Sequence, residues 1–482
     1  MKKVYRAVKK SVIYILNNSY KLDHWWLGYL ICLTGFIITI AAFYPGMMSP
    51  DSIDNFNSGR QGIYRDIASP VMSYLWGLLD SIFPGPALMF VLQNLLFWCG
   101  CAIFWYAART KHILLRLLLV LFGFMPQIIS QLTTVWKDVQ LAAAFFFVSA
   151  LLYFSKQTKY VFPVLITPVF LFYGYAVRLN AAAAVLPLAV WTGIIFCELY
   201  SSQSFIQRKT IYGGLTGIVY FFVLTAGVYF VNNKLTEGKT VYPSQQIFLY
   251  DLAAISLDRN EPLLPEYVLQ KSNFSLENVK TGYNFRSVNS LIYGDHPKKG
   301  DSPILKLTQN PDEITALKNK WYETVADNKL SYLRHRYFVF AQLNGFTRQT
   351  VSNPYWDSGF NNNPPEFRAE PNLLYKVLMK YFSLFKKYFL FRGYFWLALC
   401  FIIIYQAIKH KFQSEWQAVF FLSVSSILYN FAYFPTTPST EFRYIFWSEL
   451  AAAAAGIFAV YLLFKERSNK NGKNVTVHQN EN

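Results

Sequence analysis

Residues 27–44 read LGYLICLTGFIITIAAFY, and residues 48–54 read MSPDSID. The first stretch is apolar and long enough to cross a bilayer, which takes about 17–25 helical residues. The second stretch places Asp51 and Asp54 directly beyond the end of that helix. An Asp at the centre of a membrane helix costs about 2.5–3.5 kcal/mol, whereas one just outside the span costs little. The sequence therefore indicates a membrane helix followed by an acidic loop.

Similar apolar runs recur along most of the chain. Hydrophobic residues make up 54% of the sequence and charged residues 15%, against roughly 25% charged residues in a soluble protein. We predict an all-α polytopic membrane protein with about 10–12 transmembrane helices. The predicted spans are 27–45, 86–107, 113–132, 139–155, 160–177, 181–199, 211–231, 388–408, 416–434 and 444–464.

Two segments do not fit a simple span. Residues 70–83 are apolar but too short to cross comfortably and are interrupted by Asp80, which predicts an interfacial or re-entrant helix in the first outer loop. Residues 232–387 are polar and proline-rich, and they predict one large outer loop with a small folded cap. An extra pair of crossings near residues 333–390 remains an alternative. The expected regions are thus 1–231, 232–387, and 388–482 with a polar tail.

The basic residues are distributed unevenly. The net charge is +18; the predicted cytoplasmic segments carry 19 Lys and Arg, and the short outer loops carry 5. Positive charge accumulates in cytoplasmic loops, so the N-terminus is expected in the cytoplasm of a multi-pass protein of the cell membrane. Contact with the lipid bilayer explains the excess charge better than nucleic acid does.

Cysteine and histidine show no pattern typical of a metal site. All five cysteines lie inside apolar runs and are interpreted as small hydrophobic residues, and the six histidines are scattered singly.

The predicted topology brings several polar motifs to one membrane face. Each has a simpler interpretation, as a helix cap, a membrane anchor or a surface ion pair. Their gathering on the face poor in positive charge favours a functional site. The candidates are Asp51, Asp54, Tyr64 and Asp66 in the first loop, Lys137 with Asp138, Arg178 with Asn180, and Glu441 with Arg443.

These residue types suit the displacement of a phosphate leaving group. A carboxylate of the first loop can act as a general base toward an acceptor hydroxyl. Lys and Arg can neutralise charge on a departing phosphate. The sequence identifies no cofactor, but a pair of acids can also hold a divalent cation such as magnesium or manganese.

The layout resembles the GT-C superfamily of polytopic membrane glycosyltransferases, which use polyprenyl-phosphate-linked sugars. The resemblance rests on the acidic first loop, the two interfacial helices implied around residues 52–83 and the late outer loop. The motifs Trp136-Lys137-Asp138, Arg178-Leu179-Asn180 and Glu441-Phe442-Arg443-Tyr444 are similar to those of an uncharacterised bacterial branch. In that branch Tyr-x-Asp is followed by Trp-His-Pro-Pro, whereas this chain has Ile67-Ala68-Ser69-Pro70 and lacks the histidine.

The resemblance implies an inverting glycosyltransferase that moves a sugar from a polyprenyl-phosphate carrier to a lipid or glycan acceptor of the cell envelope. Asp51 is then the expected base, and Asp54 and Asp66 are supporting acids or metal ligands. Lys137, Arg178 and Arg443 are expected to hold the carrier phosphate, and Tyr64 can stack on a sugar ring. Two alternatives remain open: an O-antigen-type polymerase or ligase, and a lipid or glycan transporter (flippase).

Overall fold

The computed structural model describes residues 25–108, 113–200, 206–237, 240–271, 273–294, 303–347, 351–410 and 415–479. The chain is 76% helix and has no strand within these ranges, which confirms the all-α prediction. Six of the described helices are long and apolar enough to cross a membrane, as expected for a polytopic membrane protein. They are α5 (Ala87–Ala107), α8 (Lys137–Thr158), α10 (Ala182–Tyr200) with η3 (Leu179–Ala181), α11 (Ile206–Thr236), α20 (Trp416–Thr436), and η6 (Phe442–Ile445) with α21 (Phe446–Gln479).

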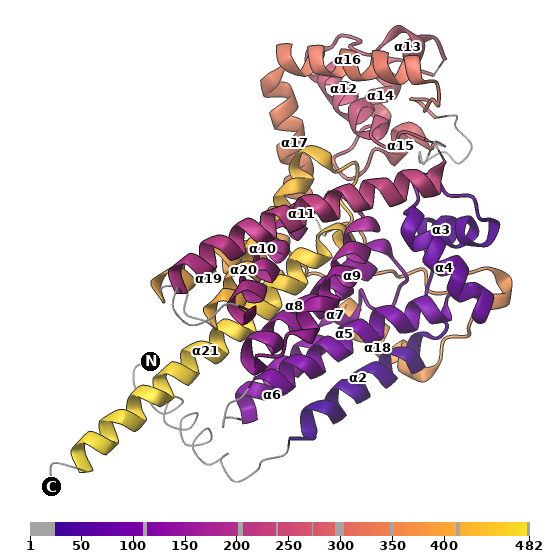
Figure 1. Cartoon of the computed structure of the whole chain (residues 1–482). Coiled ribbons are helices and arrows are strands. Elements are labelled where there is room, and N and C mark those ends of the chain that lie inside the picture. The colour runs from indigo at the N-terminus through magenta and orange to yellow at the C-terminus, as the bar shows by residue number, and fades with distance from the viewer. Residues whose placement is uncertain are drawn as a thin grey trace, which may run out of the picture.

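Shorter apolar helices occupy the positions of the other four predicted spans. They are α2 (Leu27–Phe43), α6 (Ile113–Leu121) with η2 (Phe122–Phe124), α9 (Phe162–Ala176) and α19 (Gly393–Lys409). The described part of 333–390 contains no further apolar helix of this kind, so the alternative of extra crossings there gains no support. These helices lie side by side in one bundle, and a cap covers one end of it (Figure 1).

Two short helices stand beside the cap end of the bundle, in the first loop (Figure 1). The first is α3 (Pro50–Gln61), which begins with a capping box between Ser49 and Ser52 and ends at Gly62 with φ +64°. The second is α4 (Pro70–Ile82), capped by Ser69. The two pack closely enough that a Cβ at Gly59 would lie 2.5 Å from a backbone oxygen of α4. The predicted short helix at 70–83 is therefore present, in a pair with α3.

The cap has a small hydrophobic core of its own, formed by buried residues between Leu249 and Val339. Its helices are α12 (Gln245–Arg259), α13 (Glu266–Lys271), α14 (Leu276–Gly282), α15 (Asn289–Ile292), α16 (Pro311–Asp327) and α17 (Lys329–Leu343).

The rest of the predicted large loop belongs to the bundle. Tyr355, Phe360 and Phe382 are buried in the bundle's own core, and the ring of Phe382 stacks on Phe43 of α2. This second part contains η4 (Pro365–Phe367) and α18 (Leu373–Phe385), and η5 (Phe389–Phe391) follows it. Helix α18 contacts the short α7 (Pro126–Ile129) of the bundle. The segment 232–387 therefore divides into a cap and a second part that wraps the bundle.

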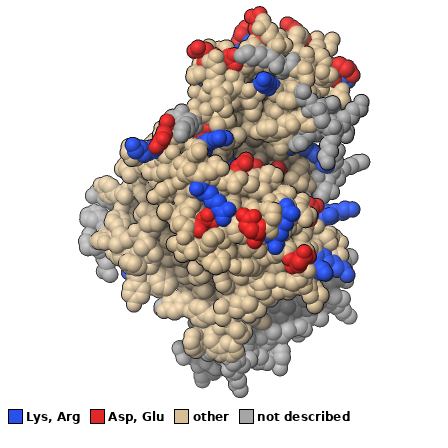
Figure 2. Space-filling view, turned by 90° about the vertical axis from the view of Figure 1, so that its right-hand side faces the viewer, with Lys and Arg blue, Asp and Glu red and all other residues tan. Residues whose placement is uncertain are grey.

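Figure 2 shows how charge is distributed over one face of the molecule. Lys, Arg, Asp and Glu gather in a band below the cap, and the described surface below that band is almost free of charge. A charged band above an apolar wall is the pattern expected where a membrane surface meets water.

Candidate functional site

The loop that carries Asp51 is fixed to the start of α8 and to the segment that follows the cap. Ser52 Oγ donates to the carbonyl of Val135 at 2.7 Å, and Trp136 Nε1 donates to Ser49 Oγ at 2.8 Å. Asn363 accepts from the backbone N–H of Met48 at 3.0 Å and donates to the carbonyl of Gly46 at 2.9 Å. These bonds hold the first turn of α3, and therefore Asp51, in one position.

Asp51 forms an ion pair with Arg443 at the start of the last membrane helix. Arg443 also binds Glu441 through Nε, and its guanidinium lies 4.9 Å from the ring centroid of Trp136. The Arg443 side chain is 5% exposed, whereas that of Asp51 is 47% exposed. Arg443 Nη1 is buried without a hydrogen-bond partner among the described residues. An unpaired buried donor calls for a functional or structural explanation.

The electrostatics of Asp51 follow from these neighbours. Arg443 lowers the pKa of Asp51 to about 2, with smaller contributions from Lys137 and Arg178, while burial acts in the opposite direction. For Asp54, one helical turn along, burial and the Asp51 carboxylate raise the pKa above its ordinary value. The two acids therefore differ: Asp51 is firmly ionised and held by arginine, whereas Asp54 takes up a proton more readily.

Arg178 forms the second buried pair of the site. Its Nη1 lies 2.9 Å from Oδ1 of Asp138, whose side chain is 1% exposed. Its Nε donates to the hydroxyl of Tyr433 at 2.8 Å, and the guanidinium lies 4.5 Å from the ring centroid of Tyr444. Tyr444 also lies 5.4 Å from the Arg443 guanidinium, so this ring lies between the two arginines.

Lys137 is the cation of the site that has no counter-ion bound directly to it within the described chain. It begins α8, is partly exposed, and interacts electrostatically with Asp51, Asp138, Arg178 and Arg443. The motif pairs of the sequence thus meet here: Asp51, Lys137, Asp138, Arg178, Glu441 and Arg443 form one cluster, called the acid–arginine cluster below.

The remaining candidates make their contacts elsewhere. Asp66 accepts backbone N–H groups of Val241 at 2.6 Å and Tyr242 at 3.2 Å, and so ties the first loop to the entrance of the cap. The ring of Tyr64 meets Tyr74 edge-on, with centroids 6.1 Å apart. Asn180, in η3, is partly buried, and its side chain makes no hydrogen bond within the described chain. These contacts give Asp66 a positioning role.

Three aromatic residues of the cluster were not among the predicted site residues. Trp136 and Tyr444 stand inside the motifs themselves, so their position next to Lys137 and Arg443 was an available signal. Tyr433, whose hydroxyl also lies 3.1 Å from that of Tyr429, belongs to the apolar helix α20 and gave no such signal.

The cap is joined to the cluster by a second buried network. Arg336 binds both carboxylate oxygens of Asp251, at 2.7 and 2.8 Å, and donates to the carbonyl of Thr437 at 2.8 Å. His335 Nε2 lies 3.2 Å from the same carboxylate, and its Nδ1 lies 2.7 Å from the hydroxyl of Tyr283. Since Thr437 begins the loop that leads to Glu441 and Arg443, this network holds the cap on the segment that supplies the arginine.

The described residues offer no ready-made protein site for the divalent cation that a pair of acids could hold. No group of three His, Cys, Asp or Glu side chains in the described residues is placed to hold a metal ion, and the one carboxylate firmly held in the cluster's opening, Asp51, binds Arg443. The arrangement therefore suits the binding of an anion near Lys137 and the arginines, next to an ionised carboxylate.

Comparison of the chain with family models, with curated proteins and with solved structures gave no match.

Proposed function

We propose that this chain is a membrane glycosyltransferase that moves a sugar from a polyprenyl-phosphate carrier to a lipid or glycan acceptor of the cell envelope. One observation carries the proposal: the half-exposed carboxylate of Asp51 is bound to the buried Arg443 beside Lys137. An acid and two cations at the end of a membrane bundle provide both a base and a phosphate site. The surrounding apolar helices suit a lipid-linked donor.

In this proposal each group has a separate task. The acceptor oxygen attacks the anomeric carbon, the bond from that carbon to the phosphate oxygen breaks, and its electron pair leaves with the phosphate. The acceptor proton passes to Asp51. Lys137 and Arg443 bind the phosphate and offset its growing charge. Attack from the face opposite the phosphate inverts the configuration.

The ion pair with Arg443 sets the order of these events. With a pKa of about 2, Asp51 is a weak base in the free protein. A phosphate bound to Arg443 competes for the guanidinium, so it raises the basicity of Asp51. The base therefore becomes effective only when the donor is in place.

A transporter is the second candidate, and one residue favours it. Glu449 lies inside α21 with 0% exposure, and neither carboxylate oxygen has a hydrogen-bond partner among the described residues. A buried ionisable group in a membrane helix is typical of proton-coupled transport.

The deciding experiment separates chemistry from transport. Purified protein is incubated with a panel of polyprenyl-phosphate sugars, and release of the free carrier phosphate is measured by chromatography. The same protein in liposomes is tested for translocation of a labelled carrier lipid. Carrier release that Asp51→Asn abolishes and Glu449→Gln preserves would support the transferase. Translocation without release, abolished by Glu449→Gln, would replace it by the transporter.

A further inference from the structure

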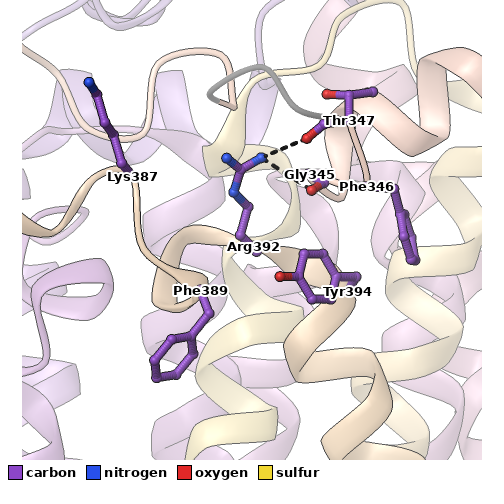
Figure 3. A pocket seen from close by; sticks show the side chains of 7 residues that line it. All are labelled: Gly345, Phe346, Thr347, Lys387, Phe389, Arg392 and Tyr394. Carbon is purple, nitrogen blue, oxygen red and sulfur yellow. Dashed lines mark hydrogen bonds between the residues drawn. The ribbon is translucent and has the colours of Figure 1, made fainter.

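A pocket of about 400 Å³ opens at the cap end of α19, separate from the acid–arginine cluster (Figure 3). Lys387 and Arg392 line it, with the rings of Phe346, Phe389 and Tyr394 and the turn 345–347. In the view of Figure 3 the charged ends of Lys387 and Arg392 point to the same side, and the ring of Phe389 points the opposite way. The pocket thus has a cationic end and an aromatic end.

The cationic end is built into the fold. Arg392 Nη1 donates to the carbonyls of Gly345 at 3.1 Å and Thr347 at 3.2 Å, as Figure 3 shows. Gly345 has φ +70°, and a Cβ there would lie 2.4 Å from Cδ of Arg392. The turn accommodates this arginine because residue 345 is a glycine and has no side chain. Lys387 is exposed and has no ion pair within the described chain. Among the described residues that line the pocket none is acidic, so it attracts an anion.

The aromatic end continues into a surface that suits hydrocarbon. Phe346 is 59%, Phe389 49% and Tyr394 37% exposed. Farther along α19, Phe401, Tyr405 and Ile408 are also exposed. Phe401 follows Tyr394 by seven residues, Tyr405 follows Phe401 by four, and Ile408 follows Tyr405 by three. These spacings place all four side chains on the same helical face. A small soluble anion would not contact this apolar face of α19, whereas acyl chains would pack along it.

We propose that this pocket binds the phosphate headgroup of an anionic phospholipid in the leaflet on the cap side, with its acyl chains along the exposed face of α19. Lys387 and Arg392 bind the phosphate, and the rings of Phe389 and Tyr394 cover the glycerol region, where aromatic side chains are commonly found. The proposal does not depend on the glycosyltransferase assignment.

The pocket lies close to the acid–arginine cluster without sharing residues with it. The ring of Phe391, next to Arg392, packs on Phe442 with centroids 5.1 Å apart, and Phe442 lies between Glu441 and Arg443 in the sequence. The backbone N–H of Phe442 donates to Ser352 at 3.0 Å. A bound lipid would therefore support the segment that carries Arg443 through one layer of side chains.

Binding is measured with purified full-length protein in a nonionic detergent, by fluorescence anisotropy of a labelled phosphatidylglycerol. We expect unlabelled phosphatidylglycerol to displace the label, and phosphatidylcholine and inorganic phosphate to do so poorly. Lys387→Gln should weaken binding at least about tenfold, since it removes a charge-assisted contact. Lys380→Gln, an exposed lysine of α18 outside the pocket, is the matched control and should leave binding unchanged.

A second variant tests the acyl-chain track. Tyr405→Gln should weaken binding of the labelled lipid severalfold without changing thermal stability, because Tyr405 is 65% exposed. Equal affinity in wild type and Lys387→Gln, or an equal loss in Lys380→Gln, would overturn the site. If inorganic phosphate displaced the labelled lipid at the same concentrations as phosphatidylglycerol, the ligand of the pocket would not be a lipid.

Discussion

Asp51 and Arg443 are 392 positions apart in the sequence, and their side chains form an ion pair where the first loop meets the last membrane helix. The contact joins α3 to η6, which precedes α21. A half-exposed acid is thereby held by an almost fully buried arginine.

Asp51→Asn keeps the shape of the side chain and removes both its charge and its basicity. We expect turnover with a polyprenyl-phosphate sugar to fall about 10²–10⁴-fold, the usual effect of losing a general base, with donor binding largely retained. Asp54→Asn is the matched control and should cost much less, since Asp54 does not bind Arg443. Turnover of Asp51→Asn within a few-fold of wild type would remove Asp51 as the base.

Lys137→Gln should weaken donor binding without loss of stability. Lys137 is partly exposed and has no direct counter-ion in the described chain, so its removal leaves no buried charge behind. Losing a charge-assisted contact to phosphate should cost about 1.5–3 kcal/mol, measured as the increase in the donor's dissociation constant. Lys376→Gln, an exposed lysine of α18, is the control. If the two variants bind donor equally well, Lys137 does not contact the phosphate.

Arg178→Ala should destabilise the fold, because it leaves the carboxylate of Asp138 buried without its partner. Removing one member of a buried ion pair typically costs about 3–5 kcal/mol. The double variant Arg178→Leu with Asp138→Leu removes both charges and should recover most of that loss. Thermal unfolding in detergent measures both. A single variant as stable as wild type would mean that Asp138 is solvated.

His335 should make the cap sensitive to acid. Burial lowers the pKa of His335, against the opposite effect of Asp251, so the unfolded chain takes up a proton first. The contribution of His335 to the free energy of unfolding is then fully present above pH about 6.5 and is lost as the pH falls through the folded-state pKa. Hydrogen exchange of α12 and α17 should therefore accelerate between about pH 7 and pH 5.

The control for this prediction is His335→Gln, which keeps a donor toward Asp251 and does not titrate. Its exchange rates, corrected for the intrinsic effect of pH, should change much less over the same interval. Equal changes in the two proteins would assign the acid sensitivity to another group.

The topology can be tested by labelling with an impermeant maleimide. In a background with the five native cysteines replaced by alanine, Asn57→Cys in the first loop and Lys280→Cys in the cap should react in intact cells, and Lys159→Cys should not. All three positions are exposed in the structure, so differences report the side of the membrane. Labelling of Lys159→Cys alone would reverse the orientation.

The helices were predictable because hydropathy is a local property. The runs that form α2, α5, α8 and α11 are each apolar along their own length, and this composition does not depend on the neighbouring segments. The division of 232–387 was not predictable in this way. Whether Phe382 packs on the cap or on Phe43 depends on a contact between distant segments, and no local pattern encodes it.

The site was predictable as a set but not as pairs. The expected topology placed Asp51, Asp138, Arg178 and Arg443 on one face, and in the structure these four side chains lie in one cluster. It could not show that Arg178 binds Asp138 while Arg443 binds Asp51, since either arginine satisfies the charge pattern. The contact between His335 and Asp251 was not predictable for the same reason, because the two residues are far apart in the sequence.

The distance between Asp51 and Arg443 along the chain also has a consequence for biosynthesis. A ribosome adds about 5–20 residues per second, so Arg443 is synthesised about 20 to 80 seconds after Asp51. During that interval the Asp51 carboxylate lacks its partner, and Asn363, which also holds this loop, is itself made only late. The acid–arginine cluster therefore forms last, and an unfinished chain in the membrane lacks this cluster.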